Sequence, residues 1–504
     1  MSKQPSDMDR GLLEQKDVNI REAVSRGGMW IFLGRWSMRG IGILSTVILA
    51  RLLVPEDFGL VAICLLVVGL AQTIGDEGQE LTVIRRQNLD RAYMDSAWTA
   101  SIITGIVLGA GVLAAAPIAA AYFEEPRAEF LIQILSIRVF LMGFYNIGLA
   151  LNRRDFNFGK DFTYTILEKI FPAIITVLLA WYLRNYWALV IGAIAGYAAT
   201  ICASYMLSAY RPRLGINHIR EVWRFSGWVM LERLAHFSSS RIDQFFVPLA
   251  GNTAPLGYYH VGSELARMPV GELFMPVDRV LAPAYARKVD QPVDLARAFI
   301  YTLSVAAIVC LPAGIGFALV AGDFVHAIYG EKWIPMAPVV QIIAVSSISV
   351  ALISAVTTLL NILGRSRLSA GLICLQALLL LGGFFLSQNH LNTISEVAWV
   401  RLITVSLALP VSLICIRIIV SVRFLDMLNV FWRPVIAASV MALTLAFLLP
   451  AGMDLPVAAR LALRIIAGGL VYSTALLLLW RIAARPPGAE QELSRLVANW
   501  LRPN

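Results

Sequence analysis

Long apolar segments alternate with short polar ones along most of the chain. An α-helix needs about 20 mostly apolar residues to cross a hydrocarbon core of about 30 Å. A window of that length predicts fourteen membrane-spanning helices, at 28–51, 57–77, 95–122, 130–151, 162–183, 186–209, 224–249, 254–285, 298–321, 334–363, 368–388, 395–416, 428–450 and 457–480. The segments between them are short, so we expect no separate soluble domain. The predicted fold class is an all-α, polytopic membrane protein.

The lysines and arginines outside these helices predict their orientation. Basic residues are enriched on the cytoplasmic side of membrane proteins. With a cytoplasmic N-terminus, 26 of them fall on the cytoplasmic side and five on the opposite side, namely Arg51, Arg127, Arg184, Lys332 and Arg460. One helix more or fewer would place basic segments on both sides of the membrane and remove the alternation between basic-rich and basic-poor segments. The asymmetry therefore supports the count of fourteen and predicts that both termini are cytoplasmic.

The composition narrows the class of protein further. The 504 residues are 58% apolar and 15% charged, with a mean hydropathy of +0.71. Soluble proteins carry about 25% charged residues, so an ordinary soluble enzyme is excluded, as are a disordered chain and a disulfide-rich secreted domain. The net charge of +9 is spread between apolar segments and forms no basic domain, which argues against a nucleic-acid partner.

Two pairs of segments resemble each other at an offset of 198 residues. Gly28–Arg35 falls on Ser226–Arg233 with Trp and Arg at matching positions, and 58–60 falls on 256–258 around a shared Gly. Two six-helix lobes with the same orientation would be related by a pseudo-twofold axis along the membrane normal. Transporters with such parallel repeats bind their substrate between the lobes.

The repeat and the charge pattern together divide the chain into six parts. They are a cytoplasmic N-terminal tail at 1–27, an N-terminal lobe at 28–209, a cytoplasmic linker at 210–223, a C-terminal lobe at 224–416, two extra helices at 417–480 and a cytoplasmic amphipathic tail at 481–504. The N-terminal tail is polar and the apolar segment after it contains arginines and no small-residue cleavage site. We therefore expect that segment to remain as the first helix and not to be removed as a signal peptide.

Several predicted helices carry polar faces that are unsuited to lipid. In 224–249, Glu232, His236, Ser239 and Asp243 lie on one stripe, with Arg233 and Arg241 beside it. In 254–285, Glu264 and Arg267 share a face, and in 28–51, Arg35 and Arg39 are one turn apart with no acid on their own helix. Ionisable groups at bilayer depth usually face protein or water. We expect these faces to converge on an aqueous, cationic cavity, where paired arginines suit a diphosphate.

A structural interpretation of these charges stays open. Glu264 with Arg267, or Arg241 with an acid on a neighbouring helix, could form ion pairs that hold the bundle in register. Helix 254–285 also contains Pro269, Pro276 and Pro283, which fit either a hinge or prolines tolerated in a packed membrane helix. Further candidates for ion coupling are Glu168, Lys169 and Arg401, each at bilayer depth.

The sequence contains no motif for catalysis. There is no GxxxxGK[ST] phosphate loop, no GxSxG nucleophile elbow and no HExxH metal motif. The five histidines are scattered without ligand spacing, and the five cysteines lie in apolar runs without a CxxC pair. We therefore expect no catalytic residues, no metal and no cofactor, and a protein that is not an enzyme.

Three segments resemble the Wzx-like oligosaccharide flippases, which form the polysaccharide transporter family of the multidrug/oligosaccharidyl-lipid/polysaccharide superfamily. The most specific is Ala50-Arg-Leu-Leu-Val-Pro-Glu-Asp-Phe-Gly-Leu-Val-Ala62, which is similar to the turn between the first two helices of these flippases. The Trp30-x4-Arg35 pattern and the basic stretch Leu151–Phe158 are similar to theirs too. Fourteen helices fit the branch that contains colanic-acid-type and succinoglycan-type exporters.

The resemblance implies a fold, a substrate and a location. The fold would be two six-helix lobes in a V around a central cavity, plus two C-terminal helices. The substrate would be an undecaprenyl-diphosphate-linked oligosaccharide repeat unit, flipped across the bacterial cytoplasmic (inner) membrane by alternating access for exopolysaccharide, capsule or O-antigen synthesis. A polysaccharide polymerase and a chain-length regulator are candidate partners.

The resemblance and the polar faces together give a hypothesis for the site. Arg35, Arg39, Arg233 and Arg267 would hold the diphosphate. Arg241, Asp243 and Glu264 would set the polarity of the cavity or couple an ion, as would Glu168, Lys169 and Arg401.

Alternatives of other classes remain. A multidrug exporter of the same superfamily would favour acids in its cavity over unpaired arginines. A lipid II flippase shares the helix count, although the Pro-Glu-Asp-Phe-Gly segment points away from it. A polymerase or ligase usually carries a long periplasmic loop, and a purely structural membrane protein has no reason to contain so many buried charges.

Overall fold

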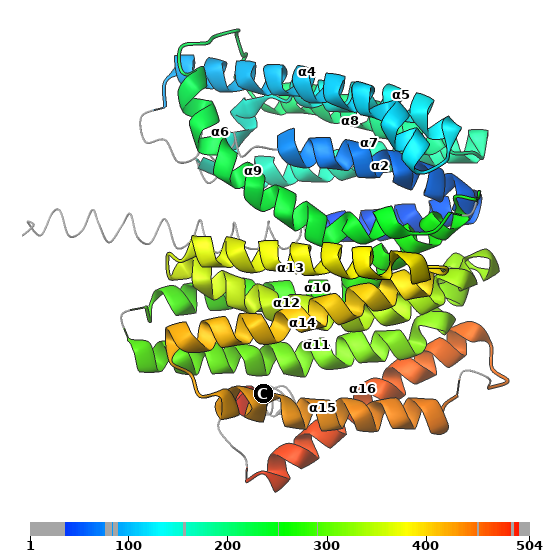
Figure 1. Cartoon of the computed structure of the whole chain (residues 1–504), viewed down its shortest axis with the longest axis vertical. Helices are drawn as coiled ribbons and strands as arrows, with labels where there is room; N and C mark the ends of the chain where they lie inside the picture. Colours follow the sequence, from blue (N-terminus) through cyan, green and yellow to red (C-terminus); the bar gives the residue numbers. More distant parts are fainter. Residues whose placement is uncertain are drawn as a thin grey trace, which may run out of the picture. The chain divides into compact units, whose positions relative to one another are not determined.

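The chain is helical throughout the part that the structure describes. This computed structural model describes residues 36–75, 83, 89–154, 158–249, 251–289, 291–450, 453–484 and 488–492, and no strand occurs among them. After a helix at 36–52, the main helices are α2 (Pro55–Gly75), α4 (Arg91–Tyr122), α5 (Pro126–Met142), α6 (Ala150–Arg154), α7 (Phe158–Leu183), α8 (Trp187–Leu207), α9 (Ile219–Arg241), α10 (Ala254–Ala286), α11 (Pro292–Tyr329), α12 (Ala337–Ile362), α13 (Ser366–Ser387), α14 (Ile394–Val420), α15 (Phe424–Phe447) and α16 (Val457–Ile482). Figure 1 labels them along the chain.

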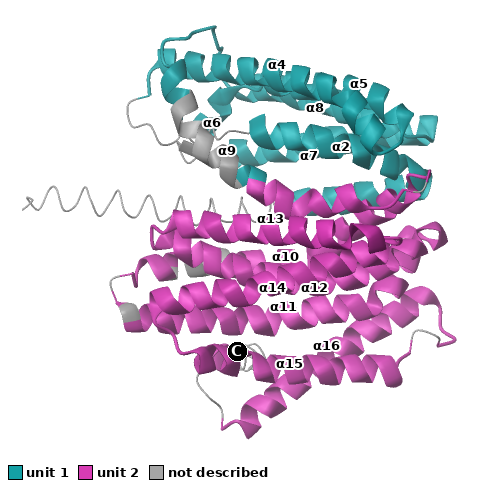
Figure 2. Ribbon diagram, in the orientation of Figure 1, with its two compact units in different colours: residues 1–234 teal, residues 235–504 magenta. Residues whose placement is uncertain are grey.

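The chain forms two compact units. Unit 1 is Met1–Leu234 and unit 2 is Ala235–Asn504 (Figure 2). The boundary between them lies within α9, so this helix contributes residues to both units.

Unit 1 is held together by helices that approach each other closely. α4 packs along α5, α7 along α8, and α2 against both α4 and α5. A Cβ on Gly196 of α8 would lie 2.4 Å from Cα of Pro172 in α7, and one on Gly192 would lie 2.1 Å from Oγ1 of Thr176. Small residues at such contacts are typical of membrane helices, because packing replaces the hydrophobic driving force there.

Asp57 gives the turn before α2 a structural role. Its Oδ2 accepts the backbone N–H of Val54 at 3.3 Å and closes the first turn of α2. Its Oδ1 accepts the backbone N–H of Tyr186 at 3.0 Å, just before α8. Asp57 is buried. Through its two hydrogen bonds, the Pro-Glu-Asp-Phe-Gly segment connects the N-terminus of α2 to the N-terminus of α8 within unit 1.

The segment between α8 and α9 runs along the start of α4. Asp95 accepts the Tyr210 hydroxyl and the backbone N–H of Arg213, the latter at 3.0 Å. Thr99 Oγ1 accepts the backbone N–H of Gly215 at 2.9 Å. Burial and the Asp95 carboxylate together raise the pKa of Tyr210, so its hydroxyl stays protonated and can keep donating. The polar segment at 208–218 is therefore fastened to unit 1.

Unit 2 is built around α12, whose apolar stretch is 72% buried. α10, α11 and α14 pack against it, and α13 packs on α14. Phe299 and Leu303 of α11, Leu352 and Leu359 of α12 and Ile416 of α14 belong to one buried apolar cluster. α15 and α16 pack on each other and on α11 (Figure 1).

Buried ion pairs at two places hold the C-terminal helices within unit 2. Asp323 of α11 binds both Arg460 and Arg464 of α16. Arg433 of α15 lies 3.1 Å from Glu490, which is buried in the short segment 488–492. This part of the C-terminal tail packs inside unit 2, while the apolar side predicted further along the tail lies outside the described residues.

The structure agrees with much of the predicted helix pattern and corrects some ends. Ten described helices are long and apolar enough to cross a membrane, and each overlaps a predicted segment. The prediction of one helix at 130–151 is wrong at its end, because α5 stops at Met142 and two short helices follow. A Cβ on Gly143 would lie 2.7 Å from the backbone oxygen of Ser101, so the chain turns where it touches α4. The helix predicted at 224–249 likewise ends early, at Arg241.

The count of fourteen helices and the two-lobe repeat stay predictions. The matching positions 58–60 and 256–258 both lie in the first turns of helices, α2 and α10. Gly28–Arg35 lies outside the described residues.

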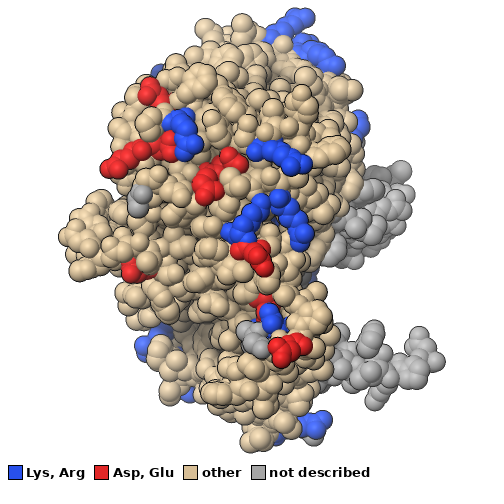
Figure 3. Space-filling view, turned by 90° about the vertical axis from the view of Figure 1, so that its right-hand side faces the viewer, with Lys and Arg blue, Asp and Glu red and all other residues tan. Residues whose placement is uncertain are grey.

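The surface has the character expected in lipid. Large apolar side chains are exposed along the helices, among them Ile118, Trp181, Leu386 and Phe447. On the face that Figure 3 shows, most of the surface is uncharged. Together with the ten apolar helices, this surface indicates a multi-pass membrane protein.

Candidate functional site

The end of α9 brings polar residues into the interior of unit 2. The helix stops at Arg241, whose backbone leaves the helical region at φ −132° and ψ −9°, and a 3₁₀ turn follows at Ile242–Phe246. The turn places the side chains of Asp243 and Gln244 inward, both with 0% exposure. The polar stripe seen in the sequence therefore ends in a buried carboxylate.

Asp243 is surrounded by donors from two helices, α10 and α14, and from its own 3₁₀ turn. Its Oδ2 accepts the Tyr259 hydroxyl of α10 at 2.9 Å and Nη1 of Arg401 in α14 at 2.8 Å. Its Oδ1 accepts the backbone N–H of Gln244 at 3.1 Å. The Arg401 side chain is only 4% exposed, so this is a buried, hydrogen-bonded ion pair.

Arg267 of α10 is held to the same carboxylate much more loosely. Its Nη2 lies 3.9 Å from Oδ2 of Asp243, which is beyond hydrogen-bond distance. Its Nε and Nη2 atoms are buried and have no hydrogen-bond partner among the described residues. The side chain as a whole is 26% exposed, and this exposed surface belongs to atoms other than Nε and Nη2.

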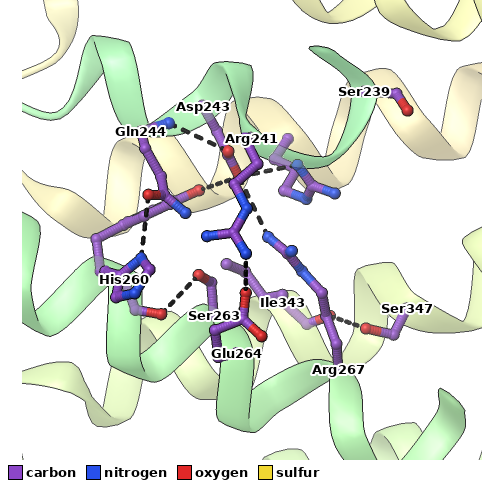
Figure 4. A network of polar contacts seen from close by, with 12 residues as sticks. Ser239, Arg241, Asp243, Gln244, His260, Ser263, Glu264, Arg267, Ile343 and Ser347 are labelled. Atoms are coloured by element: carbon purple, nitrogen blue, oxygen red, sulfur yellow. Dashed lines mark hydrogen bonds and ion pairs between the residues drawn. The ribbon is translucent and has the colours of Figure 1, made fainter. Parts of the chain in front are cut away.

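A second ion pair lies at the more open side of the cluster. Nη2 of Arg241 is 2.9 Å from Oε1 of Glu264, and these side chains are 32% and 41% exposed. Figure 4 shows Arg241 pointing to Glu264 while Arg267 points toward Asp243. Beside them, Nδ1 of His260 lies 3.2 Å from Oε1 of Gln244.

The charges in this cluster do not balance. Asp243 pairs with Arg401 and Glu264 pairs with Arg241, so two carboxylates face three arginines among its described residues. Arg267 is the excess cation. A guanidinium with a free edge binds carboxylates and phosphates through two parallel hydrogen bonds. The arrangement can therefore take up one anionic group next to Arg267.

The predicted site residues fall into two groups in the structure. Those that unit 2 brings together are Arg241, Asp243, Glu264, Arg267 and Arg401, on α9, the 3₁₀ turn, α10 and α14. Those that belong to unit 1 are Arg39, Arg233, Glu168 and Lys169, of which the last two are exposed on α7. Arg35 lies outside the described residues.

Sequence reasoning placed Gln244 beside the polar stripe of the segment 224–249 but missed the roles of Tyr259 and His260 in the cluster. Tyr259 contacts Asp243, and His260 contacts Gln244. In both pairs the two residues are sixteen positions apart in the sequence. A tyrosine inside an apolar segment gives no signal of its own, so only the break in α9 could have drawn attention to it.

Comparison with known proteins identifies the family. A family model described as "Polysaccharide biosynthesis protein" matches residues 48–338, which is more than half of the chain. The chain belongs to this family. The predicted resemblance to polysaccharide transporters is confirmed.

Relatives in this family include named transport proteins. The chain is 25% identical over 468 residues to the succinoglycan biosynthesis transport protein ExoT of Rhizobium meliloti (strain 1021), covering 92% of this chain and 94% of that protein. It is 23% identical over 336 residues to the lipopolysaccharide biosynthesis protein WzxC of Escherichia coli (strain K12), covering 65% and 68%. The first is named as a transport protein of succinoglycan biosynthesis, and the second as a protein of lipopolysaccharide biosynthesis.

Solved structures share the fold of this family member. The lipid II flippase MurJ in an inward closed conformation matches with a TM-score of 0.73 and 12% identity, over 90% of this chain and 99% of MurJ. An inward-facing multidrug resistance MATE transporter of the MOP superfamily matches with a TM-score of 0.59 and 15% identity, over 76% of this chain and 94% of the transporter. At such low identity the likeness extends to the fold alone.

Proposed function

We propose that this chain is a flippase for an undecaprenyl-diphosphate-linked oligosaccharide repeat unit. It would move the unit from the cytoplasmic to the periplasmic leaflet of the bacterial inner membrane by alternating access, with both termini in the cytoplasm. The family and its transport relatives support export for polysaccharide synthesis. A polysaccharide polymerase and a chain-length regulator would act on the delivered units.

The observation that carries this proposal is the excess positive charge at Arg267. A sugar head cannot dissolve in hydrocarbon, and a diphosphate adds negative charges that cost still more to bury. A guanidinium with two buried nitrogen atoms that lack a hydrogen-bond partner would offset that cost by binding the charged part of the substrate. The acyl tail would stay in lipid while the head passes through a polar interior.

The remaining site residues take roles in the same proposal. Arg35, Arg39 and Arg233 would add to the diphosphate site. Asp243 and Glu264 would set the local charge by pairing with Arg401 and Arg241. Because Arg401 is buried and hydrogen-bonded to Asp243, its contacts support a fixed structural charge more than ion coupling. Glu168 and Lys169 stay candidates for coupling.

A multidrug exporter is the main alternative from another class. Its cationic substrates would need an unpaired acid, whereas the described cluster in unit 2 carries an excess of arginine. A lipid II flippase would also bind a diphosphate, so the experiment must separate it by the glycan that accumulates.

The test is a strain that lacks this protein. We expect it to lose surface polysaccharide and to accumulate undecaprenyl-linked repeat units that cannot be reached from the periplasm. The chain with Arg267→Gln should fail to restore export. The matched control is Arg297→Gln on α11, where the arginine is 75% exposed and pairs with Asp294 three residues away.

Other outcomes would contradict the proposal. Unchanged polymer with raised sensitivity to cationic drugs would favour the multidrug exporter. Accumulation of peptidoglycan precursor with normal polysaccharide would favour the lipid II flippase.

A further inference from the structure

One carboxylate in unit 2 is shared unequally between two arginines. Oδ2 of Asp243 has Tyr259 and Arg401 at 2.9 and 2.8 Å, while Arg267 lies at 3.9 Å from the same oxygen. We propose that Asp243 is the resting counter-anion of Arg267 and that the phosphate group of the ligand displaces it. This inference rests on the proposed function. It specifies which group neutralises Arg267 when no ligand is bound.

The hydrogen bonds around Asp243 explain why Arg267 is the arginine that can change partners. Oδ2 already accepts two strong donors, and Oδ1 accepts the backbone N–H of Gln244. A third donor at Oδ2 therefore gains less than the first two. Arg401 is held by a direct hydrogen bond in a nearly closed environment, whereas Arg267 is held by charge alone.

The free atoms of Arg267 have the geometry that a phosphate needs. Nε and Nη2 lie on the same edge of the guanidinium, and both lack a hydrogen-bond partner among the described residues. This edge forms two parallel hydrogen bonds with two oxygens of one phosphate. A ligand phosphate would complete both bonds, which Asp243 does not complete at 3.9 Å.

Such an exchange has a consequence for the empty transporter. Without a nearby anion, a partly buried guanidinium is costly and would favour collapse or misfolding of the site. Asp243 keeps Arg267 in place at low cost when no ligand is bound. Because Asp243 competes for Arg267, it also weakens ligand binding and so helps release. Arg401 is then a positioning residue, which fixes Asp243 at the distance where it attracts Arg267 without capturing it.

The inference predicts opposite effects for two substitutions, measured as binding of inorganic pyrophosphate to the purified full chain in nanodiscs. Tyr259→Phe removes one donor from Oδ2, so Asp243 should attract Arg267 more strongly and the affinity should fall by about threefold, as for one hydrogen bond. The double change Asp243→Asn with Arg401→Gln removes the competitor together with its partner charge. It should raise the affinity by about tenfold, which is within the usual range of coupling between neighbouring sites.

Controls separate this inference from the function on which it rests. Arg267→Gln should abolish binding, and thermal melting and gel filtration check that each variant is folded. If the wild-type chain binds no pyrophosphate, the diphosphate site and the proposed function fail together. If Arg267→Gln abolishes binding but the other two variants bind like the wild-type chain, the exchange at Asp243 is overturned while the site stands.

A second probe distinguishes the source of the phosphate. Farnesyl diphosphate carries the same group on a short prenyl chain. If farnesyl diphosphate binds more tightly than inorganic pyrophosphate, and the affinities of the variants follow the same order for both probes, the result supports a lipid-linked ligand. If both probes bind equally tightly and the affinities of the variants keep that order, the result supports the displacement of Asp243 by phosphate. It would count against a lipid-linked substrate. Should the double variant fail to fold, a Tyr259→Phe affinity equal to or above the wild-type value would still overturn the inference.

Discussion

Two groups of three charged residues in unit 2, one of them at the centre of the candidate site, have the same composition but different bonding. Each has one buried aspartate and two arginines, with Asp243 facing Arg401 and Arg267 and Asp323 facing Arg460 and Arg464. Oδ1 of Asp323 accepts Nε of Arg460 at 2.8 Å, and Oδ2 accepts Nη1 of Arg464 at 2.5 Å. Both arginines of that cluster are thus hydrogen-bonded to the carboxylate.

The Asp243 cluster bonds only one of its two arginines. One carboxylate oxygen is used by the backbone of Gln244, and Arg267 lies at 3.9 Å from the other. The comparison shows that the number of charges does not reveal the role of a cluster. The Asp323 cluster joins α11 to α16, and both of its arginines are hydrogen-bonded to the carboxylate, so we infer that it is structural. The Asp243 cluster retains capacity at Arg267 for another anion.

The largest effects should follow from removing the two aspartates. Asp323→Asn leaves two mostly buried arginines without their carboxylate, which costs about 3–5 kcal/mol when a buried pair is broken. Asp243→Asn should destabilise unit 2 too, because Arg401 loses its partner. Thermal melting in detergent measures both.

Added pyrophosphate should tell the two aspartate variants apart. An anion at a hundred times its Kd stabilises by about 2.7 kcal/mol. Because Asp243 competes for Arg267, pyrophosphate at one fixed concentration should raise the melting temperature of Asp243→Asn by more than that of the wild-type chain. The melting temperature of Asp323→Asn should rise no more than that of the wild-type chain. Equal rescue of both variants would remove the distinction between the clusters.

The loosely and tightly held arginines should also differ. Arg464→Gln removes a hydrogen bond to a charged group and should cost about 1.5–3 kcal/mol of stability. Arg267→Gln removes no hydrogen bond between described residues, so its cost should be below about 1 kcal/mol, while pyrophosphate binding is lost. Melting curves and binding isotherms on the same samples provide the check. A larger stability loss for Arg267→Gln would show that Arg267 is structural.

A lysine substitution tests geometry with the charge retained. Lysine cannot form the two parallel hydrogen bonds of a guanidinium edge. Arg267→Lys should therefore weaken pyrophosphate binding by about tenfold, as for the loss of one charged hydrogen bond. Arg460→Lys serves as the control in the other cluster and should leave the affinity unchanged. Wild-type affinity in Arg267→Lys would mean that the site recognises the charge and does not need the two parallel hydrogen bonds of a guanidinium.

The smallest effect should come from Glu264→Gln at the exposed side. This change frees Arg241 from its 2.9 Å pair and adds a second available guanidinium near Arg267. Partly exposed pairs are worth about 1 kcal/mol or less, so pyrophosphate affinity should rise only about twofold to fivefold. Weaker binding would instead show that Glu264 itself supports the ligand.

The sequence predicted the membrane character and most helices because long apolar runs carry that information directly. It missed the ends of two helices. α5 stops where Gly143 touches α4, and α9 stops where the chain turns Asp243 inward. Both endings depend on contacts with segments elsewhere in the chain, which hydropathy does not contain.

The sequence predicted which residues belong to the candidate site, but not which of them form ion pairs with each other. Helical spacing identified Asp243, Glu264 and Arg267 as polar positions on two helices. It could not show that Glu264 pairs with Arg241 and not with Arg267, three residues away on its own helix, because this depends on how α9 and α10 pack. Arg401 comes 158 residues after Asp243, so no local pattern links them.

The most direct test of the account is translocation by the purified chain in liposomes. The substrate is an undecaprenyl-diphosphate-linked oligosaccharide whose sugar can be oxidised by periodate from outside, and the comparison substrate carries the same sugar on an uncharged lipid. The account predicts that the wild-type chain exposes the protected inner pool of the diphosphate lipid, that Arg267→Gln does not, and that the uncharged lipid is not moved. Equal translocation by both chains, or of both lipids, would contradict it.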